Sequence, residues 1–198
     1  MAEIAADKVQ KLRVATGVGM MTCKKALEEA EGDFDNAINI LRKAGEAKAA
    51  KRAERVANQG IIASYTHAGG RIVTMLELNC ETDFVARNEE FKELAHDLAM
   101  QVAANNPSYL NPEDVPTDVI AQETEVFRCQ LKEEGKPAAV IAKIIPGKLE
   151  KFYAENCLSK QPFIKDDSLT VGQKLNEAIA KIGEKISIGR FARFEIGA

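Results

Sequence analysis

Residues 61–78 read IIASYTHAGGRIVTMLEL, and they carry a strong hairpin signal. Two mostly apolar, β-branched runs flank a turn at Gly69-Gly70, which is a pattern typical of a β-hairpin. A further β-type run, residues 186–196, lies at the end of the chain. We expect this last run to pair with the hairpin in an antiparallel sheet backed by helices, so the predicted fold class is α+β.

The hairpin leads into residues 79–91, NCETDFVARNEEF, where an apolar strand gives way to a helix. A large aromatic residue, Phe84, follows the charged Asp83 at this junction, although junctions between elements usually face solvent. One interpretation is a hydrophobic staple, with Phe84 folded back under the helix. The other is that the ring is displayed to a partner. Residue chemistry alone slightly favours the staple.

The helix after this junction has apolar residues at helical spacing from Phe91 to Val102. Asn88 can cap its amino terminus. His96 falls on the polar face of the helical wheel, so we do not expect it to act in catalysis.

Three short helices are predicted between residues 5 and 41. The Thr16-Gly17 step ends the first helix, Thr22 can cap the second, and Asp33 can cap the third. Residues 1–45 are therefore expected to form a three-helix module with a minimal core.

Residues 42–58 change character, because six basic residues outnumber two acidic ones, a net charge of +4, on an alanine-rich background. Alanine favours helix, and few large apolar groups are available for burial. We therefore expect a solvated helical connector over residues 46–58. A nucleic-acid-binding stripe is the alternative, but no aromatic residues are interleaved with the charges.

Residues 59–198 are expected to form the α+β core domain. Helical patterns occupy residues 117–134 and about 171–185, and another runs from Val140 to Phe152. We expect Pro146-Gly147 to break or kink the helix that contains them, because proline cannot donate the internal hydrogen bond.

The composition is that of an ordinary globular chain of 198 residues, 45% hydrophobic and 29% charged, with a net charge of −3. This charge does not favour nucleic acid or an anionic membrane as a partner, and no apolar run approaches membrane length. No signal pattern opens the chain, so we expect a cytoplasmic location, or a stroma or matrix if the source is an organelle. The four cysteines form no paired motif, so we expect buried thiols and no metal site.

The motifs of common catalytic and nucleotide-binding sites are missing. The sequence has no Gly-x-x-x-x-Gly-Lys-Ser/Thr loop, no Gly-x-Ser-x-Gly elbow and no His-Glu-x-x-His helix. Neither histidine has an evident nucleophile beside it. We therefore expect a protein that acts by binding, with no cofactor and no catalytic residue.

Several motifs resemble those of bacterial-type translation elongation factor Ts. Residues 82–85 match its Thr-Asp-Phe-Val signature, and residues 16–27 contain Thr-Gly-x-Gly-Met-Met followed by Cys-Lys-Lys-Ala-Leu. The resemblance implies an amino-terminal module like a ubiquitin-associated domain. It covers essentially the whole chain, because further matches follow in the family's order at residues 135–137, 161–163, 170–173 and 193–195.

The resemblance implies guanine-nucleotide exchange on elongation factor Tu, which is the expected partner. In that family the exchange factor acts as a wedge near the nucleotide and Mg²⁺ of the GTPase and so promotes GDP release. Asp83 and Phe84 match the wedge pair, and Thr82 and Val85 complete the motif.

Two weaker sets of contact residues come with the resemblance. Met20, Met21 and Lys24 match the amino-terminal contact surface, with core packing and solvated charge as the alternatives. Ile144 and Ile145 lie where the family uses an apolar pair to grip the GTPase domain, with ordinary helix core as the alternative. The proline after this pair departs from the commoner family pattern.

Length distinguishes this sequence from longer members of the family, because only one copy of the core subdomain fits here. Longer members build one partner surface from two related core halves, so a compact member is expected to form a homodimer. Two rival functions are a ubiquitin-type adaptor and a nucleic-acid chaperone. The adaptor would bind through residues 1–45 alone, and the chaperone would lose affinity steeply with salt.

Overall fold

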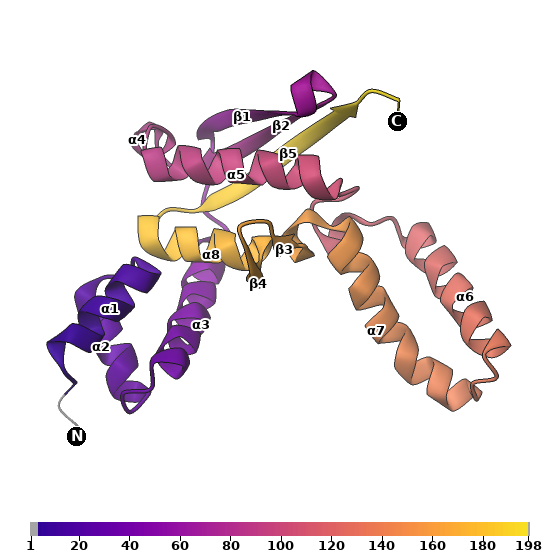
Figure 1. Ribbon diagram of the computed structural model, residues 1–198, viewed down its shortest axis with the longest axis horizontal. Coiled ribbons are helices and arrows are strands. Elements are labelled where there is room, and N and C mark those ends of the chain that lie inside the picture. The colour runs from indigo at the N-terminus through magenta and orange to yellow at the C-terminus, as the bar shows by residue number, and fades with distance from the viewer. Residues whose placement is uncertain (1–3, 198) are drawn as a thin grey trace. The chain divides into compact units, whose positions relative to one another are not determined.

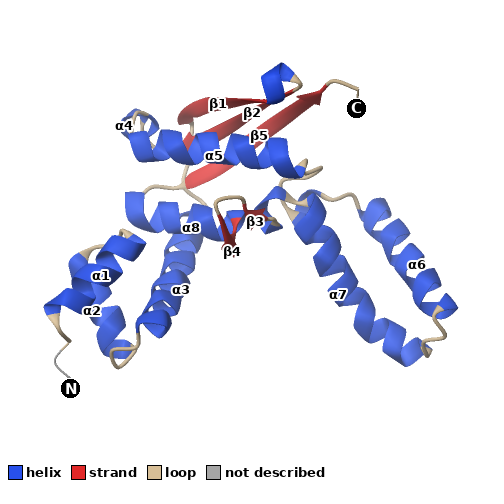
Figure 2. Cartoon of the chain, in the orientation of Figure 1, coloured by secondary structure: helices blue, strands red, loops and turns tan. Residues whose placement is uncertain are grey.

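The computed structural model describes residues 4–197. Helices dominate the chain, and the strands form two small sheets (Figure 2). The residues group into two compact units. Unit 1 contains residues up to 63, 77–95 and 173–189, and unit 2 contains residues 64–76, 96–172 and those from 190 onward. No helix within residues 4–197 is long and apolar enough to cross a membrane.

Figure 1 labels the helices and strands along the chain. The elements up to residue 105 are α1 (Ala6–Thr16), α2 (Met20–Glu29), α3 (Phe34–Arg52), β1 (Gln59–His67), the 3-10 turn η1 (Ala68–Gly70), β2 (Ile72–Cys80), α4 (Asp83–Ala86) and α5 (Glu89–Asn105). The later elements are η2 (Pro112–Asp114), α6 (Thr117–Glu133), α7 (Ala138–Asn156), η3 (Leu158–Lys160), β3 (Pro162–Phe163), β4 (Asp166–Thr170), α8 (Val171–Ile182) and β5 (Ile186–Glu195).

The main sheet has the strand order β1-β2-β5 and is antiparallel. The predicted α+β class and the pairing of the last strand with the hairpin are therefore confirmed. Burial alternates along β2, as expected for a strand with one covered face. Thr74 lies on the covered face, where its hydroxyl donates to the carbonyl of Ala99 in α5 at 2.7 Å.

A second sheet pairs β3 with β4, with Pro162 opposite Thr170 and Phe163 opposite Asp166. This hairpin was not predicted from the sequence because its strands are only two and five residues long. The buried side chain of Gln101 ties α5 to the hairpin, since its Oε1 accepts from the backbone N–H of Ile164 at 2.7 Å.

The three predicted amino-terminal helices are confirmed, and they bury an apolar core that includes Leu12 and Leu27. Gly17 ends α1 in the left-handed region at φ 66°, and Asp33 Oδ1 caps α3 by accepting from Asn36 N at 2.9 Å. The predicted cap at Thr22 is wrong. Helix α2 begins at Met20, after Gly19, and no side chain caps it.

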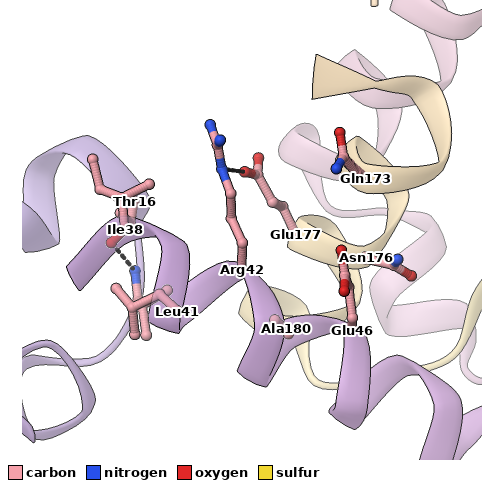
Figure 3. Close-up of a pocket in the computed structure, with 11 residues that line it drawn as sticks. Thr16, Ile38, Leu41, Arg42, Glu46, Gln173, Asn176, Glu177 and Ala180 are labelled. Carbon is pink, nitrogen blue, oxygen red and sulfur yellow. Dashed lines mark hydrogen bonds and ion pairs between the residues drawn. The ribbon is translucent and has the colours of Figure 1, made fainter. Parts of the chain in front are cut away.

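The basic segment continues α3 and leaves helix after Arg52, so residues 53–58 do not form the predicted helix. Its other half packs against α8. Gly45 is buried, and a Cβ there would lie 3.5 Å from the Cβ of Ala180. Figure 3 shows Arg42 of α3 and Glu177 of α8 pointing toward each other across a pocket, with Arg42 Nε 3.8 Å from Glu177 Oε1. The segment is thus partly packed and partly solvated.

Helices α6 and α7 pack side by side within unit 2. The Nζ of Lys148 lies 5.3 Å from the centre of the Phe127 ring, a cation–π contact between the two helices. Helix α7 runs without interruption from Ala138 to Asn156 although Pro146 lies inside it. Of the predicted break or kink at Pro146-Gly147, the break is therefore wrong, and the kink stays a prediction.

The cysteines are all free thiols. Cys23, Cys80 and Cys157 are buried, as predicted for small apolar residues, but Cys129 is exposed on α6. Within residues 4–197, no group of three or more His, Cys, Asp or Glu side chains is arranged to hold a metal ion.

Candidate functional site

The Thr-Asp-Phe-Val motif forms the start of the short helix α4, directly after the end of β2. Thr82 is the N-cap residue of α4, and its Oγ1 accepts a hydrogen bond from Val85 N at 3.4 Å. The side chain of Phe84 is 80% exposed. A ring folded under the helix would be buried, so the hydrophobic-staple interpretation of Phe84 is wrong.

The neighbours of Phe84 are held more firmly than the ring itself. Asp83 Oδ2 accepts from Arg87 Nη2 at 2.9 Å, an ion pair one helical turn along α4. Val85 is half-buried and Ala86 is buried, so this side of α4 faces the protein. The motif therefore presents Phe84 to solvent from a helix that is anchored on its other side.

Two carboxylates fix the backbone just before the motif. Glu184 Oε2 accepts from Glu81 N and Thr82 N, both at 3.1 Å, and Glu184 Oε1 accepts from the Thr82 hydroxyl at 2.7 Å. In return, Glu81 Oε1 accepts from Lys185 N at 2.6 Å. We call these four residues, Glu81, Thr82, Glu184 and Lys185, the carboxylate clamp.

Further bonds hold the clamp in place within unit 1. Lys185 Nζ donates to the carbonyl oxygens of Ala53 and Arg55, at 2.7 and 2.8 Å. Arg55 Nη1 lies 3.3 Å from Glu81 Oε1. The hydrogen bond from Lys185 N, followed by the charge of Arg55, lowers the pKa of Glu81 below its ordinary value, so this carboxylate is ionised at neutral pH.

The buried thiol of Cys80 forms a hydrogen bond to the same backbone. Its Sγ donates to the carbonyl oxygen of Thr82 at 3.1 Å. Burial, followed by the negative charge of Glu184, raises the pKa of Cys80. The thiol therefore stays protonated near neutral pH and keeps its proton for this hydrogen bond.

The candidate residues on α2 are at the surface. Met20 is 44% and Met21 is 67% exposed, so the core-packing interpretation is wrong for both. Lys24 is also exposed and lies 3.7 Å from Glu28, measured from Nζ to Oε1. Val14 of α1 is a further exposed apolar residue that the sequence analysis did not name. Val14 lies off the apolar stripe formed by Val9 and Leu12, and this position on the helical wheel could have predicted its exposure.

Ile144 and Ile145 lie in the middle of α7, in unit 2, and both are half-buried. They share that helix with one fully buried apolar residue, Ile141. Partial burial is compatible with both of the alternatives for the pair, helix packing and partner contact.

The carboxylate clamp was not predicted from the sequence either. Glu81 and Glu184 were two carboxylates among the 30 acidic residues of the chain, and they lie about 100 positions apart in sequence. Nothing local distinguishes Glu184 except that it follows Gly183, which ends α8 with its N–H bonded to the carbonyl of Ile179.

Comparison with known proteins gives the family. The model of the family described as elongation factor TS matches residues 4–198. The chain belongs to the elongation factor Ts family. The elongation factor Ts of Moorella thermoacetica is 58% identical over 194 residues, which cover 98% of this chain and 96% of that protein. The elongation factor Ts of Fervidobacterium nodosum is 56% identical over 98% of this chain and 99% of its own length.

A third elongation factor Ts, from Desulforamulus reducens, is 54% identical over the whole chain and 91% of its own length. The predicted resemblance to bacterial-type elongation factor Ts is thus confirmed over the full sequence. Family membership places the chain among the elongation factors of protein synthesis.

Proposed function

We propose that this protein promotes GDP release from elongation factor Tu, with Phe84 as its wedge. The observation that carries the proposal is the exposed Phe84 ring on an anchored backbone, within a sequence motif of the elongation factor Ts family. Covering this exposed ring with a partner is favourable, since burying a Phe side chain stabilises the complex by about 1.5–3 kcal/mol.

The action on the GTPase is one of differential binding. Mg²⁺ joins phosphate oxygens to protein ligands in such sites, so a small shift of the surrounding loops weakens nucleotide binding. Phe84 and Asp83 would occupy the space that these loops leave when GDP departs. Because the factor binds the nucleotide-free GTPase more tightly than the loaded one, linkage requires that nucleotide in turn weakens binding of the factor.

This role requires no catalytic group in the factor. The groups that would meet the partner are a ring, a carboxylate, an ammonium group and apolar side chains, and each acts by occupying space or by pairing. Met20, Met21 and Lys24 would add contact area from the amino-terminal module, and Ile144 and Ile145 from α7. We place the protein where elongation factor Tu works, which is the cytoplasm in bacteria.

We further propose that two copies associate through the uncovered face of the sheet. Arg193 Nε donates to the carbonyl of Ala103 in α5 at 3.2 Å, so Arg193 points to the covered face with Thr74. Their neighbours Met75 and Phe194 therefore point to the opposite face, and both are exposed. Such apolar side chains on a sheet face favour burial against a second copy, and twofold pairs are the commonest homo-oligomers.

The direct test is the rate at which elongation factor Tu loses labelled GDP when excess unlabelled nucleotide is added. We expect the rate to rise with the concentration of this protein and to reach a plateau. A rate that does not respond to the protein at any concentration would refute the proposed function.

A further inference from the structure

The carboxylate clamp connects a helix terminus to the motif that precedes Phe84. Helix α8 ends at Ile182, and Gly183, at φ 88°, turns the chain so that Glu184 faces the end of β2. Glycine adopts this left-handed conformation without the steric cost that a Cβ would add. The Glu184 carboxylate then takes up every backbone and hydroxyl donor of Thr82, at 3.1 Å to the amide and 2.7 Å to Oγ1.

The Thr82 hydroxyl passes this constraint on to α4. Because the hydroxyl gives its proton to Glu184 Oε1, only its lone pairs remain for Val85 N, which lies 3.4 Å away. Glu184 thereby sets the orientation in which Thr82 caps α4. Helix α4 is a single turn of four residues, too short to be stable through its own hydrogen bonds, so its position depends on this cap.

The ring of Phe84 has little else to hold it. Its side chain is 80% exposed, so the direction in which it projects follows from the backbone of residues 82–85. The backbone of residues 81 and 82 is fixed by Glu184, and the reciprocal bond from Lys185 N to Glu81 keeps Glu184 opposite that backbone.

We propose that Glu184 is a positioning residue for nucleotide exchange, which orders the Thr82 cap and so aims Phe84 before the partner arrives. The inference rests on the proposed function. Glu184 does not itself need to touch the GTPase. Fixing the wedge in advance removes an ordering cost from the step in which the nucleotide site opens, and misplacing such a group by about 1 Å can slow a reaction by roughly a hundredfold.

The test compares the GDP-release rate as a function of factor concentration for the wild type, Glu184→Ala and Glu184→Gln. We expect Glu184→Ala to lower the plateau rate by about tenfold or more, because the loss falls in the opening step rather than in encounter. Glu184→Gln keeps a carbonyl oxygen for the two backbone N–H groups but loses the acceptor of the Thr82 hydroxyl, so its plateau rate should lie between those of the wild type and Glu184→Ala.

A role limited to folding would give a different result. A partly unfolded sample behaves like a lower concentration of active factor, so it reaches the wild-type plateau at a higher total concentration. A Glu184→Ala variant with an unchanged plateau would therefore overturn the proposal. Glu54→Ala is the matched control, since it removes an exposed carboxylate beside the clamp and none of the clamp's bonds.

A double variant shows whether Glu184 acts through Phe84. In a Phe84→Ala background, Glu184→Ala should have no further effect on the plateau, whereas independent roles would add. If Phe84→Ala alone leaves exchange unchanged, the proposed function fails. If Phe84→Ala slows exchange and Glu184→Ala does not, the proposed function stands and this inference fails.

A measurement without the partner completes the test. The amide hydrogens of Glu81 and Thr82 are bonded to Glu184, so they should exchange with solvent faster in Glu184→Ala than in the wild type or in Glu184→Gln. Equal exchange rates in all three proteins would show that Glu184 does not order this backbone.

Discussion

Phe84 is an exposed aromatic residue whose neighbours, rather than its own ring, attach the motif to the protein. The side chains beside it are used for anchoring, with Asp83 paired to Arg87 and Ala86 buried. The carboxylate clamp secures the backbone before it. The exposed Phe84 ring is thus not used for anchoring, so we expect its substitution to change partner binding without changing folding.

Replacing Phe84 by Ala should slow GDP release by roughly thirtyfold at subsaturating factor, because interface aromatics often cost about 2 kcal/mol on truncation and each 1.4 kcal/mol is a factor of ten. The free energy of unfolding should change by less than about 0.5 kcal/mol, since the ring is exposed. Both quantities can be measured on one sample. A lowered unfolding energy with unchanged release would reverse the assignment.

Glu81 supplies a prediction about pH. Its pKa is lowered in the folded protein, chiefly by the hydrogen bond from Lys185 N. The unfolded chain therefore binds a proton here at higher pH than the folded chain does. The stability from this group is fully present above the ordinary glutamate pKa and is lost as pH falls through the lowered, folded-state value.

We accordingly expect the wild type to lose its stability advantage over Glu81→Gln as pH falls from just above the ordinary glutamate pKa through the lowered pKa of Glu81 in the folded protein. Urea unfolding of both proteins across that range measures the difference. Glu54→Gln makes the same charge change without touching the clamp. Its difference in unfolding free energy from the wild type should not show the same dependence on pH. An advantage for the wild type that is constant with pH would contradict this account of Glu81.

At the scale of elements, α8 links two features of unit 1. Ala180, in its last turn, packs against Gly45 of α3, and its carboxyl end leads through Gly183 to the clamp. Gly45 lies at this contact in the interior of a long helix, where glycine lowers helix stability relative to alanine, and the contact leaves room for a single added Cβ.

The space at Gly45 gives a contrast between two substitutions. An added Cβ would meet Ala180 Cβ at 3.5 Å, which is ordinary contact, and the φ of Gly45 is not in the left-handed region. Gly45→Ala should therefore raise the free energy of unfolding by about 0.5–1 kcal/mol. Gly45→Leu should lower it by about 1–3 kcal/mol, because the larger side chain overfills the contact.

Urea denaturation of the two variants would check this contrast. Ala at the nearby exposed position of Lys43 serves as the control for helix propensity without packing. Destabilisation by Gly45→Ala would mean that α3 and α8 lie closer than described.

At the scale of the whole molecule, we propose that different parts of the partner surface determine the affinity for the partner and the maximal rate of exchange. In the proposed mechanism, Phe84 would act in the opening of the nucleotide site of the partner, whereas the exposed methionines of α2 would bind the partner equally before and after opening. Interactions of that second kind change affinity without changing the maximal rate.

Substituting both Met20 and Met21 by Ala should raise the half-saturating factor concentration by roughly tenfold and leave the plateau rate unchanged. Titrations of GDP release against factor concentration report both parameters. Val126→Ala is a control, because Val126 is a comparably exposed apolar residue on α6. A fall in the plateau with no change in half-saturation would assign the methionines to the exchange step instead.

The proposed dimer is testable through the exposed sheet face. Light scattering over a concentration series should give twice the monomer mass, and Phe194→Asp should shift the protein to monomer, because a charge on the apolar face cannot be buried unpaired without cost. Val126→Asp, at an exposed apolar position on α6 and away from the sheet, is the charge control. A wild-type protein that stays monomeric at every concentration would rule out this association.

Local sequence alone determined most of the secondary structure. Helical spacing, the left-handed Gly17, the Asp33 and Asn88 caps, and the Gly69-Gly70 turn were all predictable, since each depends on residues within about four positions of one another. The same short range explains the errors. Thr22 could have capped a helix and Pro146 could have ended one, but α2 already begins at Met20 and α7 continues past Pro146, so the local preference decided neither boundary.

The Thr-Asp-Phe-Val motif was recognisable from sequence, yet only the tertiary structure decided how it is presented. The exposure of Phe84 and of both α2 methionines depends on which faces the sheet and the helices cover. Glu184 meets Thr82 only because β5 pairs with β2, which brings residues 102 positions apart into contact. No pattern in the neighbourhood of either residue encodes that contact, because strand pairing over such a distance is a property of the folded chain as a whole.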